Sequence, residues 1–265
     1  ISDFFAPTAG TYYVRVSSAS SLPYSLVLTR SATFGLESGM AQDLSATGQV
    51  LGALGGSGLG GNGLIRVAVL NAGYSGQVVN QLNDDTYFNF TAASVTAADI
   101  DTLAELNHYD VVVIGDQASR SALTTVAPVL RQWVEAGGGV VGAGWISYAA
   151  GAETGTPIAD INAILPVNSS SRTYTWYGAL DVVNDSHPVT QGVVDQTVPY
   201  YTELPQGGVD MAGAQVLAYA SGYAAVVVGE PAAGRSVYLG PVYTDSPGGF
   251  ASGNLDRLLE QAVAW

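Results

Sequence analysis

The sequence predicts a three-layer α/β sandwich with a mostly parallel sheet, preceded by an antiparallel β segment. From residue 64 onward, short Val- and Ile-rich runs alternate with amphipathic helical stripes, which is the pattern of βα units. Before residue 34, β-branched and aromatic runs follow one another without a helical segment. We therefore expect partial β-sandwich strands over 1–33, a Gly-rich linker over 34–63 and an α/β domain over 64–265.

The first part contains two runs typical of strands, at 11–16 and 24–29. An isolated hairpin is at best marginally stable in water, so we expect these runs to pair with another β segment. An unpaired hairpin is also a template for strand addition, which favours assembly with other subunits or domains. The side chains expected to be buried in that assembly are Tyr12, Val14, Val16, Leu26 and Leu28.

In the α/β domain, the third strand is the clearest element. Residues 110–116 are apolar on both faces, as a central parallel strand should be. The helix after it is expected to start near Ala127, because Pro128 costs a helical hydrogen bond beyond the first turn. The other expected elements are strands at 65–70, 86–90, 139–145, 215–220, 224–229 and 235–242, a helix over 97–106 capped by Thr96, and a last helix capped by Asn254. Together these elements suit a flavodoxin-like arrangement.

The composition excludes several classes of function. The chain has 22 acidic and 8 basic residues and a net charge of −14, which argues against sequence-independent binding of nucleic acid. All basic residues are Arg, so Schiff-base chemistry on Lys is excluded. There is no Cys, which excludes a thiolate nucleophile and Cys-ligated zinc. No apolar run reaches the roughly 18 residues of a membrane span.

A chain without Lys and Cys that is rich in Ser, Thr and Gly suits a secreted bacterial protein, so we expect an extracellular or cell-surface location. Ile1–Phe5 contains neither an initiator Met nor a signal-peptide core, which suits a processed product or a piece of a longer protein. Residues 6–16, APTAGTYYVRV, with Tyr24-Ser25-Leu26, resemble the C-terminal strands of bacterial pre-peptidase C-terminal domains. The resemblance implies a β-sandwich module of the kind appended to extracellular proteases and large surface proteins.

A second resemblance covers the α/β domain. The order of elements, with 137–144 and 186–193, resembles the class I glutamine-amidotransferase-like fold, nearest its trehalose-utilisation-like branch. Residues 234–240 resemble a late strand of that family. The family places a Cys nucleophile at a strand-to-helix elbow, and Gly144 aligns with it here. Because the chain has no Cys, glutamine amidotransferase activity is excluded.

The candidate acid/base residues are those expected beyond the carboxyl ends of the strands or on nearby loops, where ligands bind in such sheets. For His187, the alternative is a structural role in a turn that starts at His187-Pro188. As a base it would need a nucleophile and an orienting carboxylate within reach, and nothing in the sequence places a nucleophile there. The candidates are Asp116, His187, Glu203 and Asp245.

An aromatic group could bind carbohydrate, because flat apolar rings with polar edges suit stacking on sugars. Its candidate members are Trp145, Tyr174, Trp176 and Tyr177, joined by Tyr200 and Tyr201. The alternatives are packing in the core or at an edge strand, and a contact between subunits.

The sequence requires no cofactor and is compatible with calcium, since hard cations bind carboxylate and carbonyl oxygens. The closest acidic pairs are Asp84-Asp85 and Asp99 with Asp101, which also suit a solvated face or a helix N-terminus. Two His residues are too few for zinc unless carboxylates complete the site.

Two hypotheses follow. The first is a non-catalytic structural or binding module of a large secreted bacterial protein, which assembles with other subunits or domains through its N-terminal β segment. The second is an extracellular hydrolase that acts on a glycan or a peptide.

Overall fold

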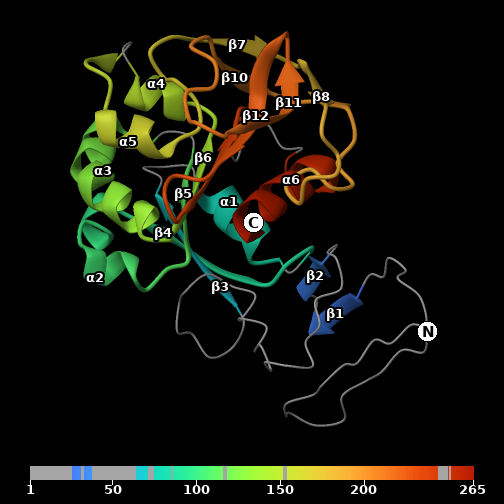
Figure 1. The fold of residues 1–265 in the computed structure, drawn as a ribbon, viewed down its shortest axis with the longest axis horizontal. Coiled ribbons are helices and arrows are strands. Elements are labelled where there is room, and N and C mark those ends of the chain that lie inside the picture. Colours follow the sequence, from blue (N-terminus) through green and yellow to red (C-terminus); the bar gives the residue numbers. More distant parts are fainter. Residues whose placement is uncertain are drawn as a thin grey trace.

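The computed structural model describes residues 26–30, 33–37, 64–70, 75–84, 86–115, 118–151, 154–243, 250 and 252–265. These residues form a mixed α/β structure around one large sheet (Figure 1). Within the described ranges the sheet has nine strands in the order β4-β3-β5-β6-β13-β12-β11-β8-β9.

The first five strands of this order are parallel to one another, and the remaining four continue the sheet in antiparallel pairs. The parallel strands are β3 (Ile65–Leu70), β4 (Phe90–Val95), β5 (Val111–Ile114), β6 (Gly139–Ala143) and β13 (Arg235–Leu239). The antiparallel strands are β12 (Tyr223–Gly229), β11 (Gln215–Ala220), β8 (Ala179–Val182) and β9 (Gln196–Thr197).

Helices cover both faces of the sheet. Side chains alternate between the two faces along each strand, and apolar side chains point to both, so each face needs its own helical cover. Val67 and Val69 of β3 face a core shared with α1 (Ser75–Leu82) and α6 (Gly253–Ala264). Ala68 and Leu70 face the opposite core. That core is shared with α2 (Leu103–Leu106), α3 (Arg120–Glu135), α4 (Ile146–Ala150) and α5 (Ala159–Ile164), the helices grouped on the left in Figure 1.

A separate two-stranded sheet lies at the carboxyl edge of the parallel strands. It consists of β7 (Arg172–Trp176) and β10 (Tyr201–Pro205) and lies at the top of Figure 1. β10 is joined to the segment after β13, since Glu203 N–H donates to the Gly240 carbonyl at 2.8 Å and Val242 N–H donates to the Tyr201 carbonyl at 3.0 Å. These bonds fix β7 and β10 next to the turn that follows β6.

The N-terminal part is described only for β1 (Leu26–Arg30) and β2 (Thr33–Glu37), which form an antiparallel pair. β1 contains Leu26 and Leu28, whose side chains lie outside the described part of the molecule, as do Tyr12, Val14 and Val16. Their expected burial therefore stays a prediction.

Strands β6 and β13 end at Ala143 and Leu239, short of the expected ends at 145 and 242. Four further expected boundaries were wrong. The strand expected at 86–90 is β4, which begins at Phe90, because Tyr87 and Phe88 N–H bind Glu260 instead of a neighbouring strand. The helix expected over 97–106 is split into a 3₁₀ turn, Ala97–Asp99, and α2, each with its own Thr capping box. The third and fourth corrections concern the starts of two helices, α3 and α6.

Pro128 lies inside α3, where a start near Ala127 was expected. The amphipathic stripe before Pro128 outweighs its missing hydrogen bond, because Leu123, Val126 and Ala127 are buried in the core. Helix α6 starts one residue before Asn254, and its N-cap is Ser252.

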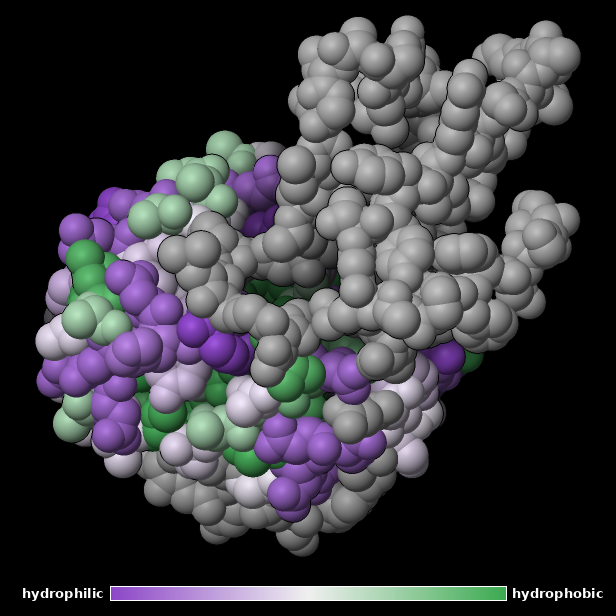
Figure 2. Space-filling view, turned by 90° about the horizontal axis from the view of Figure 1, so that it is seen from below, coloured by the Kyte–Doolittle hydropathy of each residue, from purple (hydrophilic) through white to green (hydrophobic). Residues whose placement is uncertain are grey.

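The surface mixes polar and apolar side chains. On the face shown in Figure 2, hydrophilic residues are interspersed with small hydrophobic areas, as the low content of charged residues leads one to expect. Among the helices of the described residues, none combines the length and the apolar character that crossing a membrane would require.

Candidate functional site

The turn between β6 and α4 holds the first part of the candidate site. Gly144 allows a close approach of two segments, since a Cβ there would lie 2.4 Å from Val242 Cγ2 and 2.9 Å from the Gly240 carbonyl oxygen. Trp145 follows with a left-handed backbone, φ 70°. The family resemblance predicts Gly144 at the nucleophile position, but the residue of this strand-to-helix turn with a left-handed backbone is Trp145, which has no nucleophilic group.

Glu203 lies directly behind this turn, and its side chain is completely buried. Its Oε1 accepts a hydrogen bond from Tyr148 N–H at 2.8 Å, and its Oε2 accepts one from Ser147 N–H at 3.1 Å. The Tyr238 hydroxyl lies 3.2 Å from Oε2 and 3.0 Å from the Glu203 carbonyl oxygen. Both carboxylate oxygens are thus occupied by donors of the protein itself.

Opposing effects act on the pKa of Glu203, and burial is the largest of them. Burial raises the pKa of Glu203 to about 7, although the hydrogen bonds from Tyr148, Ser147 and Tyr238 and the charge of Arg172 act in the opposite direction. Arg172 Nε lies 3.8 Å from Glu203 Oε1, and the Arg side chain is itself largely buried. Arg172 and Glu203 thus place one cation and one carboxyl group with a raised pKa next to the turn that follows β6.

Strand register explains why these groups meet. Arg172, Tyr174 and Trp176 alternate along one face of β7. Tyr201 pairs with Trp176 and Glu203 pairs with Tyr174, so both residues of β10 lie on that same face. The guanidinium of Arg172 lies over the rings of Trp145 and Tyr148, with its Cζ 4.7 and 4.5 Å from their centroids.

The structure brings the sequence-predicted aromatic residues together. Tyr201 is central, with its ring centroid 3.7 Å from that of Trp176 and 5.3 Å from those of Trp145 and Tyr174. Tyr177 lies beside Trp176 at 6.2 Å. We call the whole group the aromatic surface; its members are Trp145, Tyr148, Tyr174, Trp176, Tyr177, Tyr200 and Tyr201.

His187 lies elsewhere. Its Nδ1 accepts a hydrogen bond from Val189 N–H at 3.2 Å, and its ring packs against Trp265 at 5.2 Å. Burial lowers the pKa of His187, and the nearby Arg235 lowers it further while Glu230 opposes. None of its described contacts is shared with Glu203. The structure therefore does not bring these two candidate acid/base residues together, and it shows the turn contact of the structural alternative.

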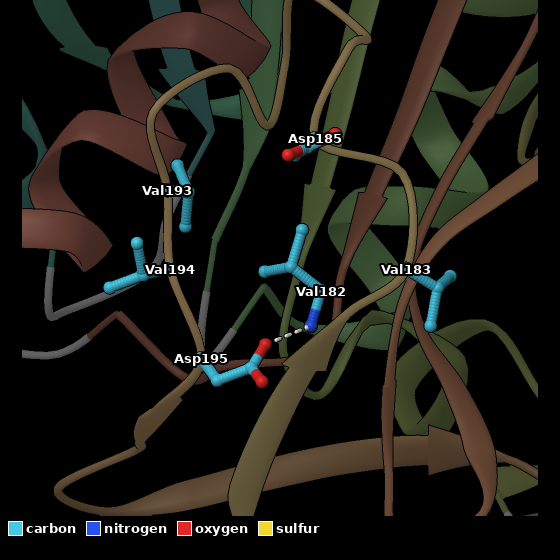
Figure 3. A pocket seen from close by; sticks show the side chains of 6 residues that line it. All are labelled: Val182, Val183, Asp185, Val193, Val194 and Asp195. Carbon is cyan, nitrogen blue, oxygen red and sulfur yellow. Dashed lines mark hydrogen bonds between the residues drawn. The ribbon is translucent and has the colours of Figure 1, made fainter.

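The other acid/base candidates, Asp116 and Asp245, lie outside the described residues. A pocket of about 400 Å³ is formed by residues on either side of His187 in the sequence. It is lined by Asp185, Asp195 and four Val residues (Figure 3). Asp195 Oδ1 accepts a hydrogen bond from Val182 N–H there, at 2.8 Å. The pocket lining contains two carboxylates but no Ser, Thr or His.

Two of the candidate calcium ligands, Asp84 and Asp99, have protein partners. Asp99 accepts hydrogen bonds from Thr96 N–H and hydroxyl at 2.8 and 2.6 Å, and Asp84 accepts one from Thr86 N–H at 2.9 Å. Asp85 lies outside the described part of the chain. Among the residues that are described, no three metal-ligating acidic or His side chains converge. Calcium binding stays a prediction of the sequence.

A second buried carboxylate lies between α6 and the segment before β4. Glu260 Oε2 accepts hydrogen bonds from Tyr87 and Phe88 N–H at 3.1 and 2.9 Å. Its Oε1 has no hydrogen-bond partner among the described residues. Burial raises the pKa of Glu260 to about 7, and the charges of Asp256 and Asp84 raise it further. Sequence reasoning did not find this group.

Sequence reasoning also missed Arg172, Tyr238 and the main-chain donors of Ser147 and Tyr148. Arg172 carried a detectable signal, since it lies two residues before Tyr174 in an alternating aromatic run. The contribution of Tyr238 depends on the register of β13 and carried no local signal.

Comparison with solved structures shows the fold. A cytoplasmic protein of Salmonella typhimurium matches with a TM-score of 0.59 at 16% identity, over 76% of this chain and 98% of its own. A second cytoplasmic protein of that organism matches with 0.61 at 13% identity, over 75% and 98%. A ThuA-like protein of Bacteroides uniformis matches with 0.50 at 18% identity, over 75% and 89%.

The likeness supports an amidotransferase-like fold of the ThuA-like kind for the α/β domain. No family model matches the sequence, and no curated protein matches it either. The resemblance of residues 6–26 to pre-peptidase C-terminal domains is not shown by these comparisons.

Proposed function

We propose that the chain is a non-catalytic binding module of a secreted bacterial protein. Its α/β domain would be a flavodoxin-like sandwich whose strand-end region binds a ligand instead of transforming it. The observation that carries this proposal is the occupation of the nucleophile turn by Gly144 and Trp145, with Glu203 buried behind them. Covalent catalysis needs an accessible nucleophile, and the Glu203 carboxylate, which could serve as one, is buried with both oxygens held by donors of the protein.

The hydrolase alternative makes a distinct demand. Glu203, with its pKa raised to about 7, has a suitable proton affinity for a general acid. Its oxygens, however, are held by main-chain donors and its side chain has no exposed surface. A substrate could reach it only if some of the groups around it, which include α4, Arg172 and Tyr238, moved.

Turnover measurements test the proposal. Purified protein is incubated with neutral polysaccharides and with casein, and new reducing ends and new amino groups are counted. We expect no release beyond that of a heat-denatured sample. Turnover that disappears in a folded Glu203→Gln variant would replace this proposal with the hydrolase.

The extracellular location and the role of the N-terminal β segment in assembly are proposed from the sequence. The composition and residues 6–26 favour a secreted module, whereas two of the similar structures are named cytoplasmic proteins. Detection of the native protein in culture supernatant tests the location. Deletion of residues 1–30 is expected to change the oligomeric state or lower the melting temperature. An unchanged value of both would contradict a role of the N-terminal segment in assembly.

A further inference from the structure

We propose that the aromatic surface binds a neutral carbohydrate chain, and that Trp176 and Tyr177 stack against its sugar rings. This inference rests on the proposed function, because it names the class of ligand that the module holds. It is carried by the exposure of the rings, by their backbone geometry, by the charge behind them and by the size of the surface.

The exposed rings form a supported platform. Trp176 is 48% exposed and Tyr177 is 61% exposed, the largest value among the exposed large hydrophobic side chains described. Their rings are inclined by only 31°, so their faces point in similar directions. Tyr200 meets Trp176 nearly edge-on, at 88°, and Tyr201 packs against it, so the indole is held in place from inside the protein. An immobilised ring loses little conformational freedom when a ligand binds.

The backbone holds Tyr177 in place at a cost. Its φ of 47° lies in the left-handed region, which Gly adopts freely and Tyr does not. A hydrogen bond from Tyr177 N–H to the Tyr200 carbonyl, 3.0 Å long, fixes this conformation. Strained residues persist where the surrounding structure determines them, and they cluster at ligand sites. Tyr177 gains little packing in return, since most of its side chain is exposed.

The charge behind the surface favours an uncharged ligand. Arg172 fills the slot between Trp145 and Tyr148, so a cationic ligand would meet a like charge there. Arg172 is largely buried and its Nε lies 3.8 Å from Glu203 Oε1, so an anionic ligand finds no exposed cation there. The exposed Tyr148, Tyr174 and Tyr177 carry hydroxyl groups, which can donate hydrogen bonds to sugar hydroxyls and accept them.

The area suits an oligosaccharide better than a protein. The exposed members are Tyr148, Tyr174, Trp176 and Tyr177, at 42–61% exposure. With about 200 Å² for each side chain, they offer roughly 400 Å². Each partner in a standard protein interface buries about 800 Å². The surface is therefore about half as large as a protein partner needs.

Affinity electrophoresis tests this inference. The full chain is run in native gels that contain hydroxyethyl cellulose, laminarin or galactomannan as neutral probes, and polygalacturonate as the anionic probe. We expect at least one neutral polysaccharide to retard the protein, and Trp176→Ala and Tyr177→Ala to weaken the retardation roughly tenfold each. The matched controls are Tyr219→Ala and Tyr223→Ala, which remove exposed Tyr rings from β11 and β12 and should leave retardation unchanged.

Several outcomes would overturn the inference. These are no retardation by any neutral probe, retardation by polygalacturonate alone, equal losses in the control variants, or a dimer that dissociates on Trp176→Ala. Far-UV circular dichroism confirms that each variant is folded, and Tyr177→Ala serves if Trp176→Ala is not. Release of reducing ends from a bound probe would instead overturn the non-catalytic function and leave the binding site intact. Absence of both binding and release would leave the proposed function standing without this ligand.

Discussion

Glu203 and Glu260 are both buried and both have a pKa raised to about 7, yet their surroundings differ. Glu203 has donors on both oxygens and Arg172 nearby. Glu260 has donors on one oxygen only, and the charged neighbours that act on it are acidic. Similar proton affinities thus arise from a nearly satisfied site and from an unsatisfied one.

The difference separates two roles of a buried carboxylate. Glu203 is built into the structure, since it ties α4 to β10 and β13 beneath the aromatic surface. Glu260 ties the start of β4 to α6 but carries an uncompensated oxygen near Asp256. Substitutions should therefore act in opposite directions at the two sites.

The largest effect is expected for Glu203→Ala. The change leaves the N–H groups of Ser147 and Tyr148 without acceptors and Arg172 without its carboxylate. Breaking a buried ion pair from one side costs about 3–5 kcal/mol of the free energy of unfolding. Urea denaturation at pH 8 measures this value. A loss below about 1 kcal/mol would show that the Glu203 contacts do not stabilise the domain.

Stability should fall as the pH rises from about 4.5 to 7. Both carboxyl groups have folded-state pKa values above the usual 4.5, so in this window the native state binds protons that the unfolded state has released. For Glu203 alone the change is on the order of 3 kcal/mol. Urea denaturation at pH 5, 6, 7 and 8 measures the slope, and Glu260→Gln should flatten it. Stability that increases between pH 5 and 7 would contradict the raised pKa values.

The matched pair Glu203→Gln and Glu260→Gln sharpens the comparison most directly. At position 203 either orientation of the amide sets an NH₂ group against a donor, which costs about 1–3 kcal/mol. At position 260 the amide oxygen can still accept from Tyr87 and Phe88, and NH₂ replaces the unpaired oxygen near Asp256. We expect this variant to be more stable at pH 8, by about 0.5 kcal/mol. Equal changes in the melting temperature of the two variants would show that the two carboxyl sites do not differ in this way.

The smallest effect concerns the surface above Glu203. Tyr177→Gly removes the strain of a left-handed Tyr and only a little packing. We therefore expect the free energy of unfolding to stay unchanged or to rise by up to about 1 kcal/mol. Trp145→Gly relieves a similar strain but loses the contacts with Tyr174, Tyr201 and Arg172, so it should destabilise. Thermal denaturation of the two variants compares them, and equal losses would show that Tyr177 is not strained.

The sequence located β3, β5 and β6 because each of these parallel strands is a short apolar run. It also predicted the aromatic group, since strand alternation keeps Tyr174 and Trp176 on one face and Tyr201 is their cross-strand neighbour. Strand β4 was misplaced because the Tyr87 and Phe88 N–H groups bind a carboxylate 172 or 173 residues away in the chain. Such a long-range contact leaves no local pattern.

The candidate acid/base set was less predictable. His187 and Glu203 were both expected beyond strand ends or on loops, but Glu203 lies inside β10. The sequence does not say which of the two binds the start of α4. Burial of Glu203 depends on the register of β7 with β10 and on the position of Tyr238. His187 was recognisable as a turn residue from Pro188, and its contact with Val189 N–H has that geometry.

The close approach at Gly144 has a consequence for protein engineering. A Cys installed at Gly144, where a sequence alignment would put it, meets the Gly240 carbonyl oxygen at 2.9 Å and Val242 before its sulfur is even placed. Position 145 already has the left-handed backbone, so a thiol belongs there, yet Trp145→Cys also empties the volume that the indole fills between Tyr174 and Tyr201. Conversion of this scaffold into a hydrolase therefore needs at least two coordinated changes, one that adds the nucleophile and one that refills the space beside it.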